Sequence, residues 1–580
     1  MWKTLIKSLR EYKKPSILAP TFVSLEVVIE CIIPFIIARL VNQISAGCEL
    51  KLILQYGLLL LVMASFSLMF GWLAGSACAT AASGFARNLR KDMFYSIQSF
   101  SFENIDRFSS SSLVTRLTTD VTNVQNAYMM IIRTAIRSPL MLIFSIVMAF
   151  IMGGRLAFIF VVMIPILAVG LFLIIRKAFP IFKRVFRKYD ALNNSVQENI
   201  QGIRVVKSFV REDFEKQKFE KAAEDLRHEF TKAEKILALN SPIMQFCLYV
   251  NMVFILTFGA YTIVTTNGLD FNVGQLSSLM VYSFLTLMSL MMLSMVFVLI
   301  TIADESGRRI VEVLQEESTL TNPENAVMEV KDGSIDFSEV SFRYSEKAKL
   351  MVLRDVNLHI ASGETIGILG GTGASKTSFV QLIPRLYDVA EGSVKVGGID
   401  VREYDLDSLR NQVSMVLQNN ILFSGTIKEN LRWGDPYASD EQLLEACKLA
   451  QADDFIMSFP KGYDTYIEQG GTNVSGGQKQ RLCIARTLLK KPKILILDDS
   501  TSAVDTKTDA NIRKALREYI PETTKIIIAQ RVASVEDADR IILLDKGKIV
   551  AVGNHEELLK SNEIYREVYD SQNKAGEQHE

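Results

Sequence analysis

Long apolar stretches alternate with charged stretches in the first part of the chain, and the later part carries only short apolar runs. A membrane-spanning helix needs about 20 mostly apolar residues. Six stretches meet that requirement, at residues 16–40, 52–78, 128–152, 156–176, 242–265 and 278–303. The pattern therefore predicts a helical membrane domain with six spans.

The distribution of basic residues predicts how these spans are oriented. Basic side chains precede the first span and recur in the long loops near residues 87–91 and 176–235, whereas the other three connections are short. Because cytoplasmic loops carry an excess of lysine and arginine, both termini and both long loops are expected in the cytoplasm. The first apolar stretch lacks a small-residue cleavage pattern, which favours a permanent membrane helix over a signal peptide.

The two long loops are expected to be helices that continue beyond the bilayer as stalks. Residues 196–223 carry apolar positions at helical spacing among many charges. The stalks could end in short turns near residues 109–119 and 199–209. Such turns either contact another domain or are simply polar connecting loops.

The pattern changes after residue 303. Residues 319–332, with Pro323, have the composition of a linker between a membrane domain at 1–318 and a soluble domain at 333–580. Short β-like runs then alternate with helical stretches, which predicts an α/β domain with a largely parallel sheet. These runs lie at residues 334–344, 364–369, 414–417, 493–497, 525–529 and 540–544.

Composition supports this division and excludes some classes of function. The chain has 580 residues, a mean hydropathy of +0.20 and 22% charged residues, which indicates apolar membrane segments beside soluble ones. Lysine plus arginine and aspartate plus glutamate both number 64, so nothing points to a nucleic-acid partner. The six cysteines are scattered without metal-type or disulfide spacing.

A phosphate-binding loop follows the β-like run at 365–369. Backbone N–H groups of such a loop cradle phosphate oxygens, Lys376 neutralises their charge, and the Thr377 hydroxyl is a candidate Mg²⁺ ligand. Ser375 stands where a glycine is usual before the lysine, so ATP binding is expected but weakened. The expected ATP contacts are Gly371, Thr372, Gly373, Ala374, Ser375, Lys376, Thr377 and Ser378.

An acidic pair follows a second apolar run, at residues 494–497. Asp498 and Asp499 end this run, in the usual arrangement for holding Mg²⁺ opposite a phosphate-binding loop. Asp498 is the candidate magnesium carboxylate.

The segment between these two motifs carries a family resemblance. Residues 474–481, Val-Ser-Gly-Gly-Gln-Lys-Gln-Arg, resemble the signature motif of ABC transporters. Tyr344 matches the adenine-stacking position, Gln418 the Q-loop and residues 502–505 the D-loop. The membrane half resembles that of ABC exporters. The resemblance therefore covers nearly the whole chain.

The resemblance implies that two ATP-binding domains stack head to tail. Each ATP would lie between the phosphate-binding loop of one domain and the signature motif of the other, so one chain supplies half of each site. It assigns ATP contacts to Tyr344, Gln418, Ser475, Gly476, Gly477 and Gln478, and magnesium contacts to Thr377, Gln418 and Asp498. The implied cofactors are ATP and Mg²⁺.

Three residues depart from the family pattern, all in the phosphate-loop half of the site. Asp499 replaces the glutamate that polarises the attacking water, Gln530 replaces the switch histidine, and Ser375 replaces a glycine. A misplaced base costs on the order of 10²–10⁴-fold in rate, unless Asp499 acts through a second water. The pattern resembles the degenerate subunit of heterodimeric bacterial exporters, in the plasma membrane.

Two features of the spans are candidates for substrate contact. Glu26 and Glu30 share a face of the first span, and Arg133 and Arg137 share a face of the third. They form either a site for charged substrate groups or, the favoured interpretation, an ion pair between helices or arginines at the cytoplasmic interface. Methionines at helical spacing on the sixth span line a cavity or pack against a neighbour. They are Met288, Met291, Met292 and Met295.

The expected function is ATP-driven export of a hydrophobic or amphipathic compound, such as a drug, lipid or peptide. The expected partners are a second half-transporter and membrane lipid. An ATP-gated regulator or channel-like protein is the alternative, and the fused arrangement disfavours an importer.

Overall fold

The computed structural model describes residues 1–345, 348–500 and 503–577. It divides into two compact units. The first comprises Met1–Gln98 and Ser109–Glu316, and the second comprises Ser99–Phe108 and Glu317–Glu580. Each unit is described by itself.

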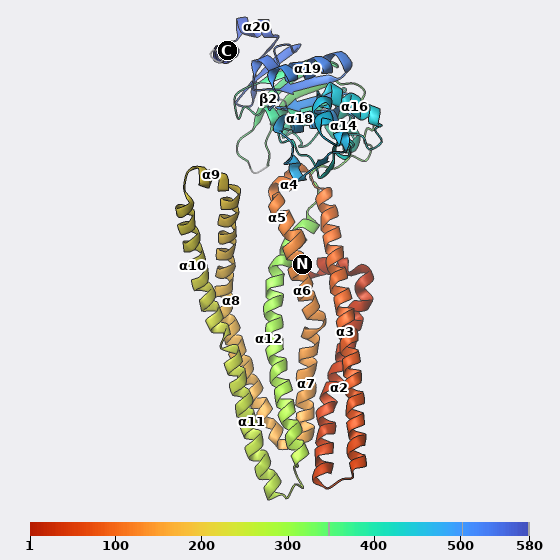
Figure 1. Ribbon diagram of the computed structural model, residues 1–580, viewed down its shortest axis with the longest axis vertical. Coiled ribbons are helices and arrows are strands. Elements are labelled where there is room, and N and C mark those ends of the chain that lie inside the picture. The colour runs from red at the N-terminus through yellow and green to blue at the C-terminus, as the bar shows by residue number, and fades with distance from the viewer. Residues whose placement is uncertain (346–347, 501–502, 578–580) are drawn as a thin grey trace. The chain divides into compact units, whose positions relative to one another are not determined.

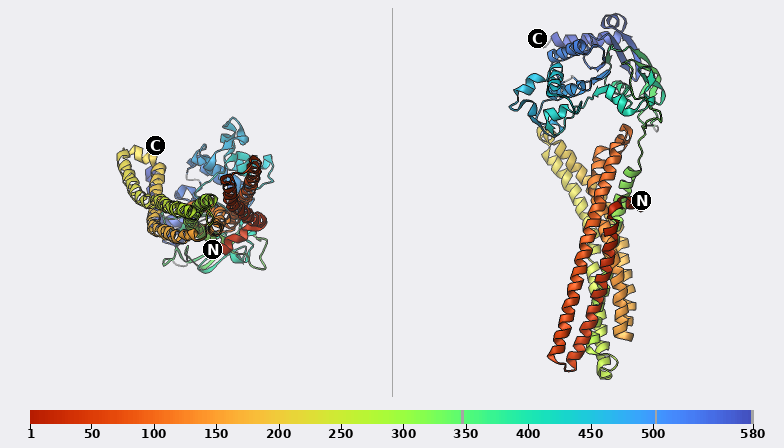
Figure 2. Two further views of the ribbon diagram at one scale, coloured as in Figure 1. Left: turned by 90° about the horizontal axis from the view of Figure 1, so that it is seen from below. Right: turned by 90° about the vertical axis from the view of Figure 1, so that its right-hand side faces the viewer.

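The first unit is built from long helices (Figure 1). Its helices are α1 (Trp2–Ile6), α2 (Lys13–Ser45), α3 (Leu50–Gln98), α5 (Ser110–Thr115), α6 (Val121–Ile132), α7 (Thr134–Gly153), α8 (Phe158–Gln201), α9 (Ile203–Ser208), α10 (Glu212–Leu237), α11 (Asn240–Thr265) and α12 (Val273–Gln315). The helices α2 and α3 run side by side, as do α8 and α10 (Figure 2).

The six expected spans fall on these helices. In the described residues, five helical stretches are long and apolar enough to cross a membrane. The third of them, Ser110–Phe182, contains two expected spans, because a short 3₁₀ turn at Gly154–Ala157 joins α7 to α8. The expected helical membrane domain is therefore present, and each of the six expected spans overlaps one of these stretches.

Several helices are longer than a bilayer requires. The 44 residues of α8 span roughly 66 Å at 1.5 Å per residue, about twice the thickness of the hydrocarbon core. Its later part packs against the charged helix α10, with Phe182 against Phe230 and Arg184 bonded to Glu229 at 3.1 Å. The length of α8 and its packing against a charged helix agree with the expected stalk that continues beyond the bilayer.

Three of the four charged residues singled out in the spans, Glu26, Glu30 and Arg137, form an ion pair between helices, as favoured from the sequence. Arg137 on α7 donates to Glu26 at 2.5 Å and to Glu30 at 2.8 Å, both on α2. Glu26 is only 7% exposed. Charged groups in a membrane are usually paired in this way, because hydrocarbon offers them no solvation.

The second unit contains the expected largely parallel sheet. Its strand order is β12-β11-β3-β10-β9-β6, and only the edge strand β12 is antiparallel. The strands are β3 (Thr365–Leu369), β6 (Val413–Val416), β9 (Ile494–Asp498), β10 (Thr524–Ile528), β11 (Arg540–Asp545) and β12 (Lys548–Gly553). All residues of β3, β9 and β10 are buried, as expected for central parallel strands.

The expected run at residues 334–344 belongs to a different sheet. It forms β1 (Ile335–Phe342), which pairs antiparallel with its neighbours in the order β2-β1-β4-β5. The other members are β2 (Leu353–Ile360), β4 (Glu391–Val396) and β5 (Ile399–Asp400), and a two-stranded ribbon holds β7 (Gly425–Thr426) and β8 (Tyr466–Ile467).

The helices of the second unit surround these sheets. They are α13 (Lys376–Gln381), α14 (Leu406–Gln412), α15 (Ile427–Leu431), α16 (Asp440–Leu449), α17 (Asp453–Ser458), α18 (Gly476–Leu488), α19 (Thr506–Tyr519), α20 (His555–Ser561) and α21 (Glu563–Glu577). One buried cluster lies between β3, β10 and the antiparallel sheet, and another joins α16 and α18 to β9.

A short helix from the loop between α3 and α5 also belongs to the second unit. This helix, α4 (Phe102–Phe108), packs its Phe102 against the core that contains Tyr387. The turn expected to contact another domain near residues 109–119 is therefore misplaced by about ten residues. Residues Ser110–Thr115 continue the long helical stretch of the first unit because Ser109 caps α5 through its side chain.

The other expected turn has the predicted form. Gly202 separates α8 from α9, and the two exposed residues Phe209 and Val210 follow α9. Whether this turn contacts another domain stays a prediction.

Candidate functional site

The candidate site lies at the carboxyl edge of the parallel sheet, where three central strands end at the same level. The register aligns Ile368 of β3 and Asp498 of β9 with Ile528 of β10. The segments that follow these strands must therefore be neighbours. They are the phosphate-binding loop, the acidic pair and the loop that begins at residue 529.

The phosphate-binding loop has the backbone that its glycines allow. A Cβ on Gly370 would lie 2.3 Å from the carbonyl oxygen of Leu544, so only glycine permits this approach to β11. Gly373 has a φ of +81°. The loop then enters α13 and exposes N–H groups at a helix start, which suits phosphate oxygens.

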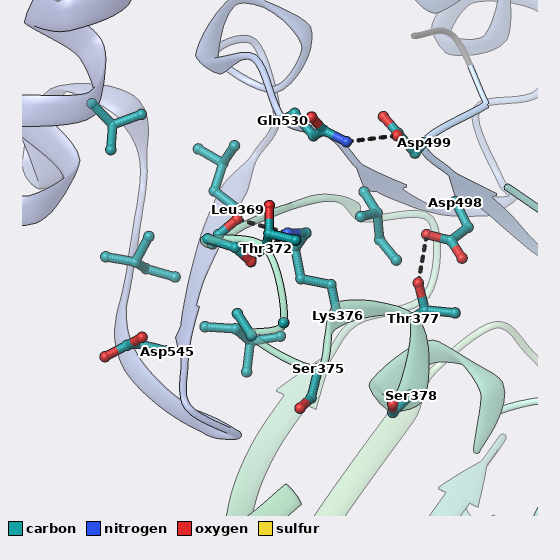
Figure 3. A pocket seen from close by; sticks show the side chains of 18 of the residues that line it. Leu369, Thr372, Ser375, Lys376, Thr377, Ser378, Asp498, Asp499, Gln530 and Asp545 are labelled. Carbon is teal, nitrogen blue, oxygen red and sulfur yellow. Dashed lines mark hydrogen bonds between the residues drawn. The ribbon is translucent and has the colours of Figure 1, made fainter. Parts of the chain in front are cut away.

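Ser375 adopts the conformation that makes its identity unusual. It precedes α13 with φ +73° and ψ +24°, in the left-handed region. A non-glycine residue in such a conformation costs about 1–3 kcal/mol. The serine side chain points away from Lys376 and the acidic pair (Figure 3). Ser375 thus strains the loop without filling the space beside the lysine.

Lys376 is folded back onto the loop. Its Nζ donates to the carbonyl oxygens of Gly370 at 2.6 Å and Gly371 at 3.1 Å. Burial lowers the pKa of the Lys376 ammonium, and the nearby Asp498 and Asp499 oppose that shift. A bound phosphate would place negative charge beside this buried ammonium and so favour its protonated form.

Asp498 and Thr377 fit a magnesium ion. The Thr377 hydroxyl donates to Asp498 Oδ1 at 3.2 Å, and Asp498 Oδ2 is buried without a hydrogen-bond partner among the described residues. Burial raises the pKa of the Asp498 carboxyl, and the charge of Asp499 adds to that rise. A carboxylate and a hydroxyl are hard oxygen ligands of the kind Mg²⁺ prefers.

The two other departures from the family pattern contact each other. Gln530 donates its Nε2–H to Asp499 Oδ2 at 2.8 Å (Figure 3). Asp499 has a φ of +49° and its N–H donates to the carbonyl oxygen of Ile528. One oxygen of the carboxylate that would polarise a water thus accepts a hydrogen bond from the amide that replaces a histidine.

The loop at residue 530 is also held by the C-terminal helix α21. The side chain of Gln572 donates to the carbonyl oxygen of Gln530 at 2.9 Å and accepts from the N–H of Val532 at 2.8 Å. These two bonds fix the backbone on both sides of Arg531. This contact could not be predicted, because nothing in the sequence pairs residues about forty positions apart.

A cavity of about 530 Å³ joins most of these residues. Among the predicted site residues, those of the phosphate loop line it together with Gln418, Asp498, Asp499 and Gln530. The lining also includes residues that the sequence analysis missed, namely Leu369, Gly370, Ile528, Leu543, Leu544, Asp545, Ile564, Tyr565 and Val568. Asp545 could have been predicted, since it ends a parallel strand beside β3.

Tyr344 lies beside this cavity and is not part of its lining. Its hydroxyl is 2.7 Å from the hydroxyl of Ser378, which does line the cavity, and 39% of the tyrosine is exposed. An adenine base could therefore reach the ring from solvent.

The signature motif lies elsewhere in the second unit. Ser475 caps α18, because its Oγ accepts from the N–H of Gln478 at 3.3 Å while Gln478 Oε1 accepts from the N–H of Ser475. Gly476 and Gly477 begin that helix, and a Cβ on Gly477 would lie 2.8 Å from the carbonyl oxygen of Ala503. None of the cavity-lining residues in the described part of the chain comes from 475–478.

The D-loop is only partly described. Ser502 lies outside the described residues. Asp505 caps α19 by accepting from the N–H of Thr508 at 2.9 Å.

Asp498→Asn is expected to separate folding from metal binding. Removing the charge of this buried carboxyl should stabilise the nucleotide-free protein, because burial disfavours the charged form, whereas the Mg²⁺ dependence of ATP binding should disappear. Thermal unfolding without nucleotide and ATP titrations with Mg²⁺ or EDTA would measure the two effects. A destabilised variant that still shows Mg²⁺-dependent binding would contradict this assignment.

Comparison with known proteins identifies the family. Residues 17–319 match the model of the ABC transporter transmembrane region, and residues 353–502 match that of the ABC transporter ATP-binding domain. The Bacillus subtilis ABC transporter ATP-binding protein YfiB is 37% identical over 94% of both chains. An ATP-dependent lipid A-core flippase of Desulfotalea psychrophila is 34% identical over 84% of both chains.

A solved structure supports the same fold. The structure of a bacterial Atm1-family ABC exporter with ATP bound superimposes with a TM-score of 0.83, covers 97% of this chain and is 24% identical in sequence. The chain therefore belongs to the ABC transporter family, and its helical membrane domain followed by an ATPase domain has the expected exporter-type fold.

Proposed function

We propose that the chain is one half of a heterodimeric exporter and that its own ATP site is the slow one of the pair. The observation that carries this proposal is the hydrogen bond between Gln530 and Asp499. In this bond, the carboxylate of Asp499, which would act as the base, accepts from the neutral amide of Gln530 in place of a histidine. The signature motif, by contrast, has an intact cap at Ser475.

Within this proposal, the phosphate-loop half of the site holds ATP with Mg²⁺. Lys376 and the loop N–H groups bind the phosphates, and Thr377, Asp498 and Gln418 face the magnesium ion. When bound, Mg²⁺ neutralises charge on the phosphate oxygens. Tyr344 stacks on the adenine from the exposed side of its ring.

The signature half acts on the partner's ATP. Because the Ser475 Oγ accepts from Gln478, its own O–H remains available to donate to a phosphate oxygen. The N–H groups at Gly476 and Gly477 add the positive end of α18. Rapid hydrolysis then takes place on the partner's phosphate loop.

Exposed apolar surface supports a partner chain. Leu417, Ile421, Phe423 and Trp433 are each at least 42% exposed in the ATPase domain, and the rings of Phe423 and Trp433 stack at 4.2 Å. At the end of α9, Phe209 is 72% exposed. Exposed aromatic groups of this kind mark interaction surfaces.

The proposed substrate is a hydrophobic or amphipathic compound such as a lipid, drug or peptide. A cavity of about 520 Å³ between α8 and α12 supports this class, because its lining is apolar apart from Ser294 and Arg176. That volume suits a small amphiphile. The similarity to lipid A-core flippases favours a lipid within this range.

We also propose that the protein is integral to the bacterial plasma membrane with both termini in the cytoplasm. The proposed domain bounds along the chain are a membrane domain at 1–318, a linker at 319–332 and the ATPase domain at 333–580, with residues 99–108 packing in the second unit. The basic residues that precede the first span support this orientation.

An ATP-gated regulator or channel-like protein is the second candidate. The hydrogen bond between Gln530 and Asp499 also favours this candidate, because a protein that uses ATP only to close its domains does not need a catalytic base. Substrate-stimulated ATP hydrolysis would support export, and ATP-dependent passive conductance would support the regulator.

The test is purification of the chain, tagged at its C-terminus, from its native membrane, followed by mass spectrometry. We expect a second half-transporter at a one-to-one ratio, with glutamate after its magnesium aspartate and a switch histidine. Recovery of this chain only, as a dimer with rapid ATP hydrolysis, would contradict the proposal.

A further inference from the structure

The hydroxyl of Tyr387 connects the ATP site to α4. Tyr387 follows the phosphate-loop helix α13 by six residues and is only 8% exposed. Its hydroxyl donates to Asp106 Oδ2 of α4 at 2.7 Å, and its ring lies 6.1 Å from that of Phe102. Burial raises the pKa of the tyrosine hydroxyl, so the group stays protonated as a donor at neutral pH.

The same ring contacts the adenine-stacking candidate. Tyr344 and Tyr387 meet edge to face, with centroids 5.1 Å apart and planes at 85°. Phe342 contacts both rings, at 4.9 Å and 5.7 Å. Edge-to-face pairs are directional and resist rotation of one ring past another. If the ring of Tyr344 rotates, it therefore pushes directly against the ring of Tyr387.

Tyr387 is held too rigidly to absorb such a change locally. The preceding Arg385 is 5% exposed and bonds Asp388 at 2.9 Å through Nε, while its own carbonyl oxygen accepts from Arg410 at 2.7 Å. Arg385 also has a φ of +50°. A segment fixed by this many bonds moves as a piece, because a packed core deforms little.

The opposite side of α4 is tied to the segment that follows α12. The Asn104 side chain donates to the carbonyl oxygen of Glu317 at 3.2 Å, and the hydroxyls of Ser101 and Thr319 are 2.7 Å apart. The helix α4 is thus held between this segment and Tyr387. If Tyr387 shifts, α4 therefore moves relative to the segment that contains Glu317 and Thr319.

We propose that Tyr387 is a positioning residue that transmits adenine binding at Tyr344 to α4. The proposal rests on the proposed function only in requiring that ATP binds to this chain. The Tyr344 hydroxyl lies 2.7 Å from the Ser378 hydroxyl and donates to Gln381 Oε1 at 3.4 Å. Stacking of a base on the exposed face of Tyr344 reorients its ring, and the edge-to-face contact moves Tyr387 with Asp106.

The base, rather than the phosphates, is therefore the part of ATP that α4 senses. Tyr387 is not among the described residues that line the phosphate cavity. A phosphate ligand without a base fills the loop at Lys376 and places no stacking partner on the exposed face of the Tyr344 ring. This separates the transmission route from the hydrolytic residues.

The experiment compares hydrogen exchange of the amides in residues 99–108 in the full-length protein in lipid nanodiscs, with and without Mg²⁺-ATP. In the unmodified protein, ATP should change the exchange rate at α4 at least about threefold. Magnesium tripolyphosphate, which lacks a base, should not. In Tyr387→Phe, ATP should bind within about twofold of its normal affinity and the change at α4 should be lost.

Tyr463→Phe is the matched control. Its hydroxyl donates to Asp453 at 2.8 Å in the same unit, so it loses the same kind of tyrosine–aspartate bond away from α4. This variant should retain the ATP-dependent change. A purely structural role for Tyr387 would alter exchange at α4 equally with and without ATP.

Two results would overturn the proposal. They are a normal ATP-dependent change in Tyr387→Phe, and an equal change with tripolyphosphate. A rapidly hydrolysing dimer of this chain would contradict the proposed slow site without affecting either measurement, so the two failures are distinguishable.

Discussion

The double variant Asp499→Glu, Gln530→His should raise ATP hydrolysis by the purified chain on the order of 100-fold. A correctly placed general base contributes about 10²–10⁴-fold, and both parts of the base machinery are altered in the natural chain. The glutamate adds one methylene of reach, and the histidine removes the amide that now donates to Asp499. Steady-state phosphate release measures the rate.

The single variants should fall well short of the double variant. Glutamate alone still faces the Gln530 amide, and histidine alone leaves the carboxylate too short. Residues that act as a unit are not additive. Adding Asp498→Asn to the double variant should return the rate to its original level, because it removes the candidate magnesium carboxylate. A natural chain that already hydrolyses ATP as fast as the double variant would contradict the slow-site assignment.

The central strands could be predicted from sequence because each is a short apolar run followed by polar or glycine residues of a recognisable motif. The runs before Gly370 and Asp498 were located to within a residue. Their meeting at one sheet edge follows from parallel pairing, which alternating strands and helices indicate. That logic extends to Asp545, which the sequence analysis did not include although its strand was recognised.

Contacts between residues distant in sequence could not be predicted in the same way. The docking of α4 was misplaced because Phe102 and Asp106 have no pattern that separates them from the neighbouring polar helix. They are recognised as docking residues only in the folded chain, where they contact Tyr387. The hold of Gln572 on the loop at Gln530 depends equally on the folded position of α21. The strain at Ser375 was foreseen, since the missing glycine itself suggests a left-handed residue.

Ser475→Ala in the complex with the partner chain should lower ATP hydrolysis on the order of 10²-fold, the usual cost of removing one donor to a developing negative charge. The reason is that Ser475 Oγ accepts from the N–H of Gln478, so its O–H can donate to a phosphate brought by the partner. Lys376→Ala, which affects this chain's own slow site, should leave most of the activity. The ATPase rate of the co-purified complex would be measured for each variant.

The chain supplies a closely matched control for the folding effect of this substitution. Ser439 caps α16 with the same capping box, since its Oγ accepts from the N–H of Gln442 at 3.3 Å and its N–H donates to Gln442 at 2.9 Å. Losing either cap costs about 1 kcal/mol, so Ser439→Ala and Ser475→Ala should unfold at similar temperatures. Only Ser475→Ala should lose activity. Equal activity of the two variants, or a larger loss from Lys376→Ala, would mean that rapid hydrolysis takes place on this chain's own phosphate loop.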